Sequence, residues 1–238
     1  MAQDPNAALP GVDSTRMELD SLVINAELTL ISIIQGIALY FLTNASYPRL
    51  IWLDLEHWPY IATGLCIILI FWSRSIIHAL TVIRWPLRLG HNFLYVASTL
   101  IEAVMFTQVG DVLAWHAAGA AYAVTIWLLF AIDMRMIQDW ARDRTGSASQ
   151  ALTEVLSRDQ LLNVRVLMPL TAAFYAVATW IIAARPLWFG PGLVLALGLV
   201  QLAWTIAYLY VRAAREFDEY GERIMRRLEE EGKVKVDE

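Results

Sequence analysis

The sequence predicts an all-α, polytopic membrane protein with six transmembrane helices. The chain has 238 residues, of which 58% are hydrophobic and only 17% charged, whereas soluble domains carry about 25% charged residues. Six mostly apolar runs follow one another along the chain. About 20 helical residues cross the hydrocarbon of a bilayer, so each run is long enough to span it. These runs leave little sequence for a separate soluble domain.

The six expected spans divide the chain into three regions. The spans cover 19–43, 58–82, 91–110, 112–137, 161–184 and 187–211. A polar arm, 1–18, precedes this membrane domain of 19–211, and a charged, helical tail follows it over 212–238. The arm is polar and the first run is too long for a signal peptide, so we expect no cleavable signal. The third and fourth spans, and the fifth and sixth, are joined by short loops and should form antiparallel hairpins.

The basic residues predict that both termini lie in the cytoplasm. Arginine and lysine concentrate in short cytoplasmic loops of membrane proteins. With the N-terminus inside, the outer segments hold only Arg49 and Arg185. The inner segments before the tail hold Arg16, Arg84, Arg88, Arg142, Arg144 and Arg158. Tryptophan and tyrosine at the expected borders, among them Trp52, Trp58, Tyr60 and Trp115, suggest an aromatic belt at the outer surface.

A row of polar and small side chains runs along one face of the first span. Their spacing of three or four residues places them together on a helix. Such a row should turn away from lipid, toward other helices or water, because an unpaired polar group in hydrocarbon costs several kcal/mol. The row can therefore serve helix packing or line a conduction path. The pore-lining candidates are Ser21, Asn25, Thr29, Ser32 and Gln35.

Ionisable side chains within the spans are the main functional pointers, because each is costly in a bilayer unless it is paired or hydrated. Glu102 lies near the middle of the third span, and a polar track of His91, Tyr95 and Ser98 leads to it on the same helical face. It is either a buried acid that joins helices or a titrating, ion-facing group.

Polar side chains at similar depth are expected to connect the first two spans. Glu27 lies near the inner end of the first span, and Arg74 and His78 near that of the second. We expect Glu27 to pair with Arg74 or to share a hydrogen bond with His78. Arg74 can instead extend to the lipid headgroups. Asp133 and Arg135, at the inner end of the fourth span, are interpreted as border residues.

Catalytic and metal-binding motifs are absent from the sequence. No HExxH, GxSxG or Walker A motif occurs, and Cys66 is the only cysteine, so we expect no enzyme, no cofactor and no CxxC-type metal site. The four histidines are expected at different depths, without metal-ligand spacing. Clustered alanines with Gly119 in the fourth span predict close helix packing. Pro169 should kink the fifth span, and Gly190-Pro191-Gly192 should form a turn.

Three local features carry a resemblance to a known family. Arg16-Met17-Glu18 precedes the first span, Phe71-Trp72 is followed by His78 in the second, and a closing hairpin runs from Arg165 to Tyr208. In these features the chain resembles the small bacterial relatives of the lysosomal potassium channel whose first helix carries a Phe-Ser-Asp signature. The signature itself is absent, since Asp20-Ser21-Leu22 stands at its place. The resemblance implies a potassium-permeable pore formed by several copies, with the first helix lining it.

The sequence therefore favours a cation channel or ion-translocating protein, built as an oligomer in a bacterial plasma membrane. Helix one would line the path for monovalent cations, and Glu102 would be a buried modulator. The alternative is a non-catalytic scaffold subunit of a larger membrane complex, whose polar row joins it to partner helices. The expected partners are the lipid bilayer and other copies or subunits, and not nucleic acid.

Overall fold

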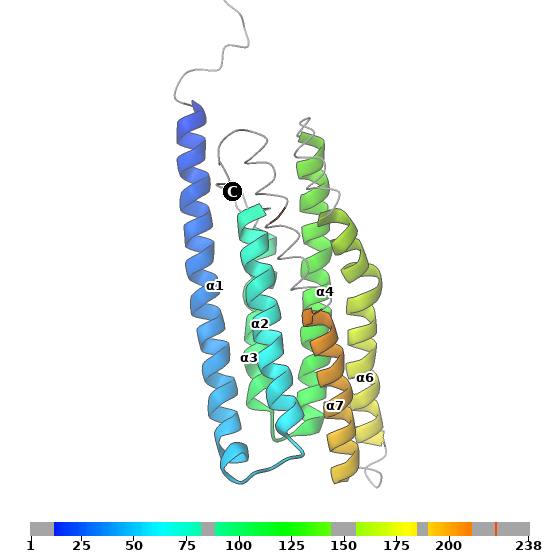
Figure 1. Ribbon diagram of the computed structural model, residues 1–238. Helices are drawn as coiled ribbons and strands as arrows, with labels where there is room; N and C mark the ends of the chain where they lie inside the picture. The colour runs from blue at the N-terminus through cyan, green and yellow to red at the C-terminus, as the bar shows by residue number, and fades with distance from the viewer. Residues whose placement is uncertain (1–11, 82–88, 144–155, 185–189, 211–221, 223–238) are drawn as a thin grey trace, which may run out of the picture.

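The computed structural model describes residues 12–81, 89–143, 156–184, 190–210 and 222. These residues form helices and short connections, with no strand among them. The elements are α1 (Val12–Ile51), α2 (Trp58–Thr81), α3 (Leu89–Thr107), α4 (Val112–Asp143), the π-helical turn η1 (Asn163–Leu167), α6 (Met168–Ala184) and α7 (Pro191–Tyr208). They lie side by side as one bundle, with α1 at one side and α6 at the other (Figure 1). The prediction of an all-α fold is confirmed.

Five helical segments of the described chain are long and apolar enough to cross a membrane. They are Ser21–Ile51, Trp58–Ala79, Val112–Asp139, Leu156–Ala184 and Pro191–Tyr208. These segments overlap five of the six predicted spans, and the multi-pass character of the chain rests on them. The remaining predicted span corresponds to α3, where His91, Asn92 and Glu102 lower the hydropathy. That helix nonetheless packs within the bundle, against α1 and α4.

The helix boundaries differ most from prediction in α1, which begins at Val12 and ends at Ile51. Proline lacks a backbone N–H and usually breaks a helix, yet Pro48 lies inside the last turn of α1. Leu53, just after this end, has a positive φ of 50° and reverses the chain toward α2. Most of the loop predicted over 138–160, and the charged tail except Glu222, lie outside the described residues.

One half of the bundle is held by a dense aromatic core. Tyr60 and Trp115 are fully buried and their rings meet edge to face, with centroids 5.7 Å apart. The Tyr60 hydroxyl donates a 2.7 Å hydrogen bond to the carbonyl of Val194, and Gly198 lets the ring approach α7. Their assignment to the aromatic belt is therefore wrong, because both rings face the interior.

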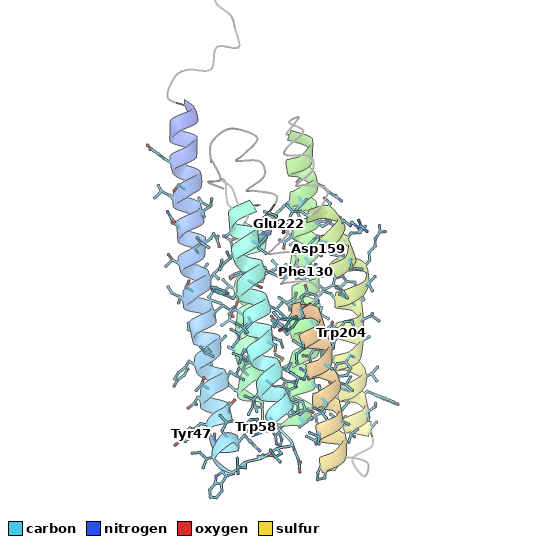
Figure 2. All side chains as sticks on the ribbon, viewed as in Figure 1. Tyr47, Trp58, Phe130, Asp159, Trp204 and Glu222 are labelled. Atoms are coloured by element: carbon cyan, nitrogen blue, oxygen red, sulfur yellow. The ribbon has the colours of Figure 1, made fainter. Side chains whose placement is uncertain are left out.

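Exposed aromatic side chains do occur at that end of the bundle. Trp52 is 82% exposed and Trp58 is 44% exposed. Figure 2 shows Trp58 and Tyr47 at the same end of the bundle. This arrangement fits the belt expected at headgroup depth.

Small residues let α4 and α6 pack closely, as the sequence predicts. A Cβ added at Gly119 would collide with the ring of Tyr175, which is buried on α6. The predicted kink at Pro169 stays a prediction; a π-helical turn, η1, directly precedes α6, whose second residue is Pro169. The predicted turn at Gly190-Pro191-Gly192 is instead the start of α7, because Gly190 is its extended N-cap residue and the next two residues are helical.

Candidate functional site

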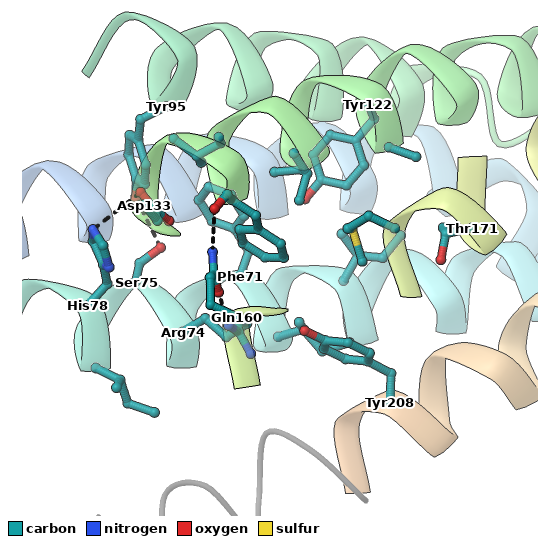
Figure 3. Close-up of a pocket in the computed structure, with 18 of the residues that line it drawn as sticks. Phe71, Arg74, Ser75, His78, Tyr95, Tyr122, Asp133, Gln160, Thr171 and Tyr208 are labelled. Carbon is teal, nitrogen blue, oxygen red and sulfur yellow. Dashed lines mark hydrogen bonds and ion pairs between the residues drawn. The ribbon is translucent and has the colours of Figure 1, made fainter. Parts of the chain in front are cut away.

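A cavity of about 170 Å³ lies inside the bundle and is the candidate functional site. Side chains from α1, α2, α3, α4, residues 156–160, α6 and α7 line it, so nearly every described element contributes (Figure 3). Most of its wall is apolar. The charged and imidazole side chains in the described part of the wall are Glu27, Arg74, His78, His91, Asp133 and Asp159.

His78, His91 and Asp133 form a cluster from three helices. His78 lies in the last turn of α2, His91 near the start of α3, and Asp133 in α4. His91 Nε2 is 3.1 Å from Asp133 Oδ1, and His78 Nε2 is 3.6 Å from the same oxygen. The two imidazole rings are stacked with centroids 5.2 Å apart. We call these three residues the His–His–Asp cluster.

Two neighbours complete the surroundings of this cluster. The other ring nitrogen of His91, Nδ1, lies 3.1 Å from the side-chain oxygen of Asn92, which can only accept a hydrogen bond. Glu27, buried on α1, interacts electrostatically with His91. The cluster and Glu27 together place two imidazoles and two carboxyl groups at the interior of the bundle.

Arg74, one turn before His78 on α2, is held by an acid, an amide and an aromatic ring. Its guanidinium lies 3.2 Å from Asp159 Oδ2 and donates a 3.2 Å hydrogen bond to Gln160 Oε1. It also stacks over the Phe130 ring, 5.0 Å from the centroid. Figure 2 shows Phe130 and Asp159 in this interior region between the helices. A planar guanidinium suits this combination of carboxylate and aromatic face.

The structure gives Arg74 and His78 partners that the sequence did not predict. Arg74 pairs with Asp159, which lies just before η1. His78 faces Asp133 of α4 (Figure 3), and the predicted pairing of either residue with Glu27 stays a prediction. Sequence spacing could not find these partners because both come from helices distant along the chain.

The π-helical turn places a buried polar side chain against two residues that line the cavity, Asp159 and Tyr208. Asn163 is fully buried, and its Nδ2 donates a 3.0 Å hydrogen bond to Asp159 Oδ2. Its Oδ1 accepts a 3.2 Å hydrogen bond from the hydroxyl of Tyr208 on α7. A π-helical turn re-aims side chains relative to a regular helix and often occurs at functional sites. The Arg74–Asp159 pair is thereby tied to α7 through Asn163.

Comparisons of the chain with protein-family models, curated proteins and solved structures found no match. The resemblance to relatives of a potassium channel accordingly stays a prediction, and the site is interpreted from its own geometry.

The polar row of the first helix lies on the outside of the described chain. Ser21, Asn25, Thr29 and Ser32 are exposed among the described residues. The Thr29 and Ser32 hydroxyls donate to the carbonyls of Asn25 and Leu28, at 2.8 and 2.9 Å. Their hydrogen-bonding demand is thus met within α1, so these two side chains do not require water.

Gln35 and Glu102 behave differently from that row, because both are buried between α1 and α3. They are polar neighbours, but their geometry falls short of a hydrogen bond, and neither carboxyl oxygen of Glu102 has such a partner within the described residues. The predicted track from His91 through Tyr95 and Ser98 to Glu102 is entirely buried. Only its first two members line the cavity.

Sequence reasoning missed the His–His–Asp cluster and expected the histidines at different depths. One signal could have found it. His78 ends one helix and His91 begins the next, so the connection between them returns both rings to the same end of the bundle. Asp133 was interpreted as a border residue, although it is 94% buried and faces both rings. The arrangement supplies imidazole nitrogens and carboxylate oxygens, which together bind cations.

Proposed function

We propose that this chain is a cation-translocating membrane protein whose ion-binding site is the cavity inside the bundle. In this proposal α3 also crosses the membrane, which brings the number of spans to six, and both termini face the cytoplasm. The observation that carries it is a pair of buried acids that line the cavity: Asp133, which faces both histidines, and Glu27, which interacts electrostatically with His91. Ionisable groups at such depth are expensive and are typical of ion pathways and proton relays.

Stability alone is a weak explanation for these groups. A buried ion pair often contributes no more than well-packed apolar side chains of similar volume would. The bundle already has a dense aromatic core around Tyr60 and Trp115. Retaining acids, imidazoles and a guanidinium around a cavity is therefore better explained by a bound or passing cation.

The test is cation flux into liposomes that contain the purified protein, measured separately for K⁺, H⁺ and Co²⁺. The wild type should show flux above protein-free liposomes for at least one of them, and Asp133→Asn should reduce it at least about tenfold. Glu102→Gln is the matched control, because it neutralises another buried acid that does not line the cavity. It should retain flux within about twofold. Absence of flux for all three cations would refute the proposal.

A second candidate path runs along the outer face of α1, between copies of the chain. The exposure of Asn25 and the rest of the polar row favours it, because a pore axis between protomers would leave that row uncovered in one protomer. In that case Asn25→Leu should abolish flux, and Asp133→Asn should leave it unchanged. A scaffold subunit would instead show no flux and copurify with other membrane proteins.

A further inference from the structure

We infer that the His–His–Asp cluster is a binding site for a divalent transition-metal ion, ligated by His78, His91 and Asp133. The inference deepens the proposed function, and rests on it, by naming the class of cation that the cavity takes. Its foundation is the meeting of two imidazole nitrogens on one carboxylate oxygen inside the bundle.

The distances are close to those of a loaded site. Metal–ligand bonds of about 2.0–2.2 Å in tetrahedral geometry separate the ligand atoms by about 3.4 Å. The two His–Asp separations are 3.1 and 3.6 Å, and all three potential ligand atoms lie within 4.8 Å of one another. A small approach of the two stacked rings would bring the third separation into range. Three protein ligands leave further positions open for water or a cargo group.

The hydrogen bond to Asn92 orients His91 for this role. The Asn92 side-chain oxygen can only accept a hydrogen bond, so a neutral His91 ring that donates Nδ1–H to it carries its lone pair on Nε2. That lone pair is directed at Asp133 Oδ1, which also carries only lone pairs. A cation between these atoms relieves their repulsion. Metal-binding histidines almost always donate their second N–H to such an acceptor.

The local charge also suits a divalent ion. Arg74 interacts electrostatically with His78 and Asp133, but the paired carboxylate of Asp159 offsets its charge. The remaining carboxylates beside the histidines are Asp133 and Glu27, of which Glu27 interacts with His91. Two carboxylates balance the charge of one divalent cation. Imidazole and carboxylate together favour Zn²⁺, Fe²⁺ or Co²⁺ over Mg²⁺ and Ca²⁺, which prefer oxygen ligands alone.

The experiment measures metal binding by the full chain purified in detergent without a polyhistidine tag. After removal of metal with a chelator, the protein is titrated with Co²⁺, and bound metal is quantified by mass spectrometry and visible absorption. The wild type should bind one Co²⁺ per chain. His91→Gln and Asp133→Asn should each weaken binding at least about tenfold, and Asn92→Ala, a positioning change, by about 10- to 100-fold.

The control is His57→Gln, which removes a histidine from the loop between α1 and α2 and should bind Co²⁺ like the wild type. Zn²⁺ should raise the melting temperature of the wild type and not that of Asp133→Asn, which separates loss of the site from loss of fold. Less than about 0.1 Co²⁺ per wild-type chain, or equal binding by the wild type and both ligand variants, would overturn the inference.

Binding and flux can fail separately. Flux of K⁺ or H⁺ by a protein that binds no Co²⁺ would overturn the metal site and leave the proposed function standing. Stoichiometric, Asp133-dependent binding without flux of K⁺, H⁺ or Co²⁺ would establish the metal site and refute translocation.

Discussion

A buried hydrogen-bond chain through Gln201 offers a quantitative test of how the bundle is held together. Gln201 on α7 is 2% exposed and lies between Trp115 of α4 and Tyr175 of α6, which are also buried. Its Oε1 accepts a 3.1 Å hydrogen bond from Trp115 Nε1, and its Nε2 donates a 2.7 Å hydrogen bond to the Tyr175 hydroxyl. One amide thereby connects three helices. Gln201→Met keeps the length of the side chain and removes both bonds.

The expected loss in the free energy of unfolding follows from these two bonds. Side-chain hydrogen bonds in membrane proteins are worth about 0.6 kcal/mol on average, so two of them set a floor of about 1 kcal/mol. The indole N–H of Trp115 would also be left buried without an acceptor, and such a group costs about 1–3 kcal/mol. We therefore expect Gln201→Met to destabilise by about 2–3 kcal/mol. Tyr175→Phe, which breaks one bond, should cost about 1 kcal/mol or less.

The assay is reversible unfolding in mixed micelles, followed by the helical circular dichroism signal. Gln108→Met is the matched control, because Gln108 is only partly buried and its side chain donates a hydrogen bond to that of its neighbour Thr107. This change should cost less than about 0.5 kcal/mol. The double variant Gln201→Met/Tyr175→Phe should be less destabilised than the sum of the two single changes, because both remove the same bond. If Gln201→Met and Gln108→Met gave equal losses, the hydrogen-bond chain would have no part in stability.

Two further predictions concern packing and charge. Gly119→Ala should destabilise by about 1–3 kcal/mol, because its methyl group would meet the buried tyrosine ring of α6. Gly36→Ala, which meets nothing within 4 Å, should instead stabilise by up to about 1 kcal/mol in the same unfolding assay. In the loop before α2, burial alone would raise the pKa of Asp54, but hydrogen bonds from His57 and Arg49 outweigh it and lower that pKa. The carboxylate therefore contributes stability above its unfolded pKa of about 4, and this stability is lost as the pH falls through the lower folded pKa. Melting temperatures between pH 7 and 3 should show the wild type losing its advantage over Asp54→Asn in that acidic range, and a constant difference would contradict the assignment.

The helices could be predicted from the sequence because apolar length determines them locally. Predicted and observed boundaries of the second and fourth helices agree at their starts, at Trp58 and Val112. Gly119 also carried a correct local signal, for close helix packing. Each of these features depends on residues within one or two helical turns, which a single sequence displays directly.

The partners of the buried charges could not be predicted in the same way. Arg74 meets Asp159, and His78 meets Asp133, across separations along the chain that no local pattern encodes. The π-helical turn at Asn163 is equally invisible, because the sequence around it reads as a regular amphipathic helix. Helical periodicity gives the face of a residue within one helix. It does not give the rotation of that helix against its neighbours.

The same limit explains why the sequence indicated Glu102, and not Asp133, as the main candidate for a functional acid. Depth within a span made Glu102 the most expensive acid, and the structure agrees that it is fully buried. Its surroundings, however, offer Gln35 and no cationic side chain among its described neighbours, and it does not line the cavity. Asp133 lies nearer the end of its helix and faces two imidazoles across that cavity. The neighbours of an acid therefore indicate an ion-binding role better than its depth in the membrane does. Neutralising Asp133 should alter cation binding, whereas neutralising Glu102 should alter only the contact between α1 and α3.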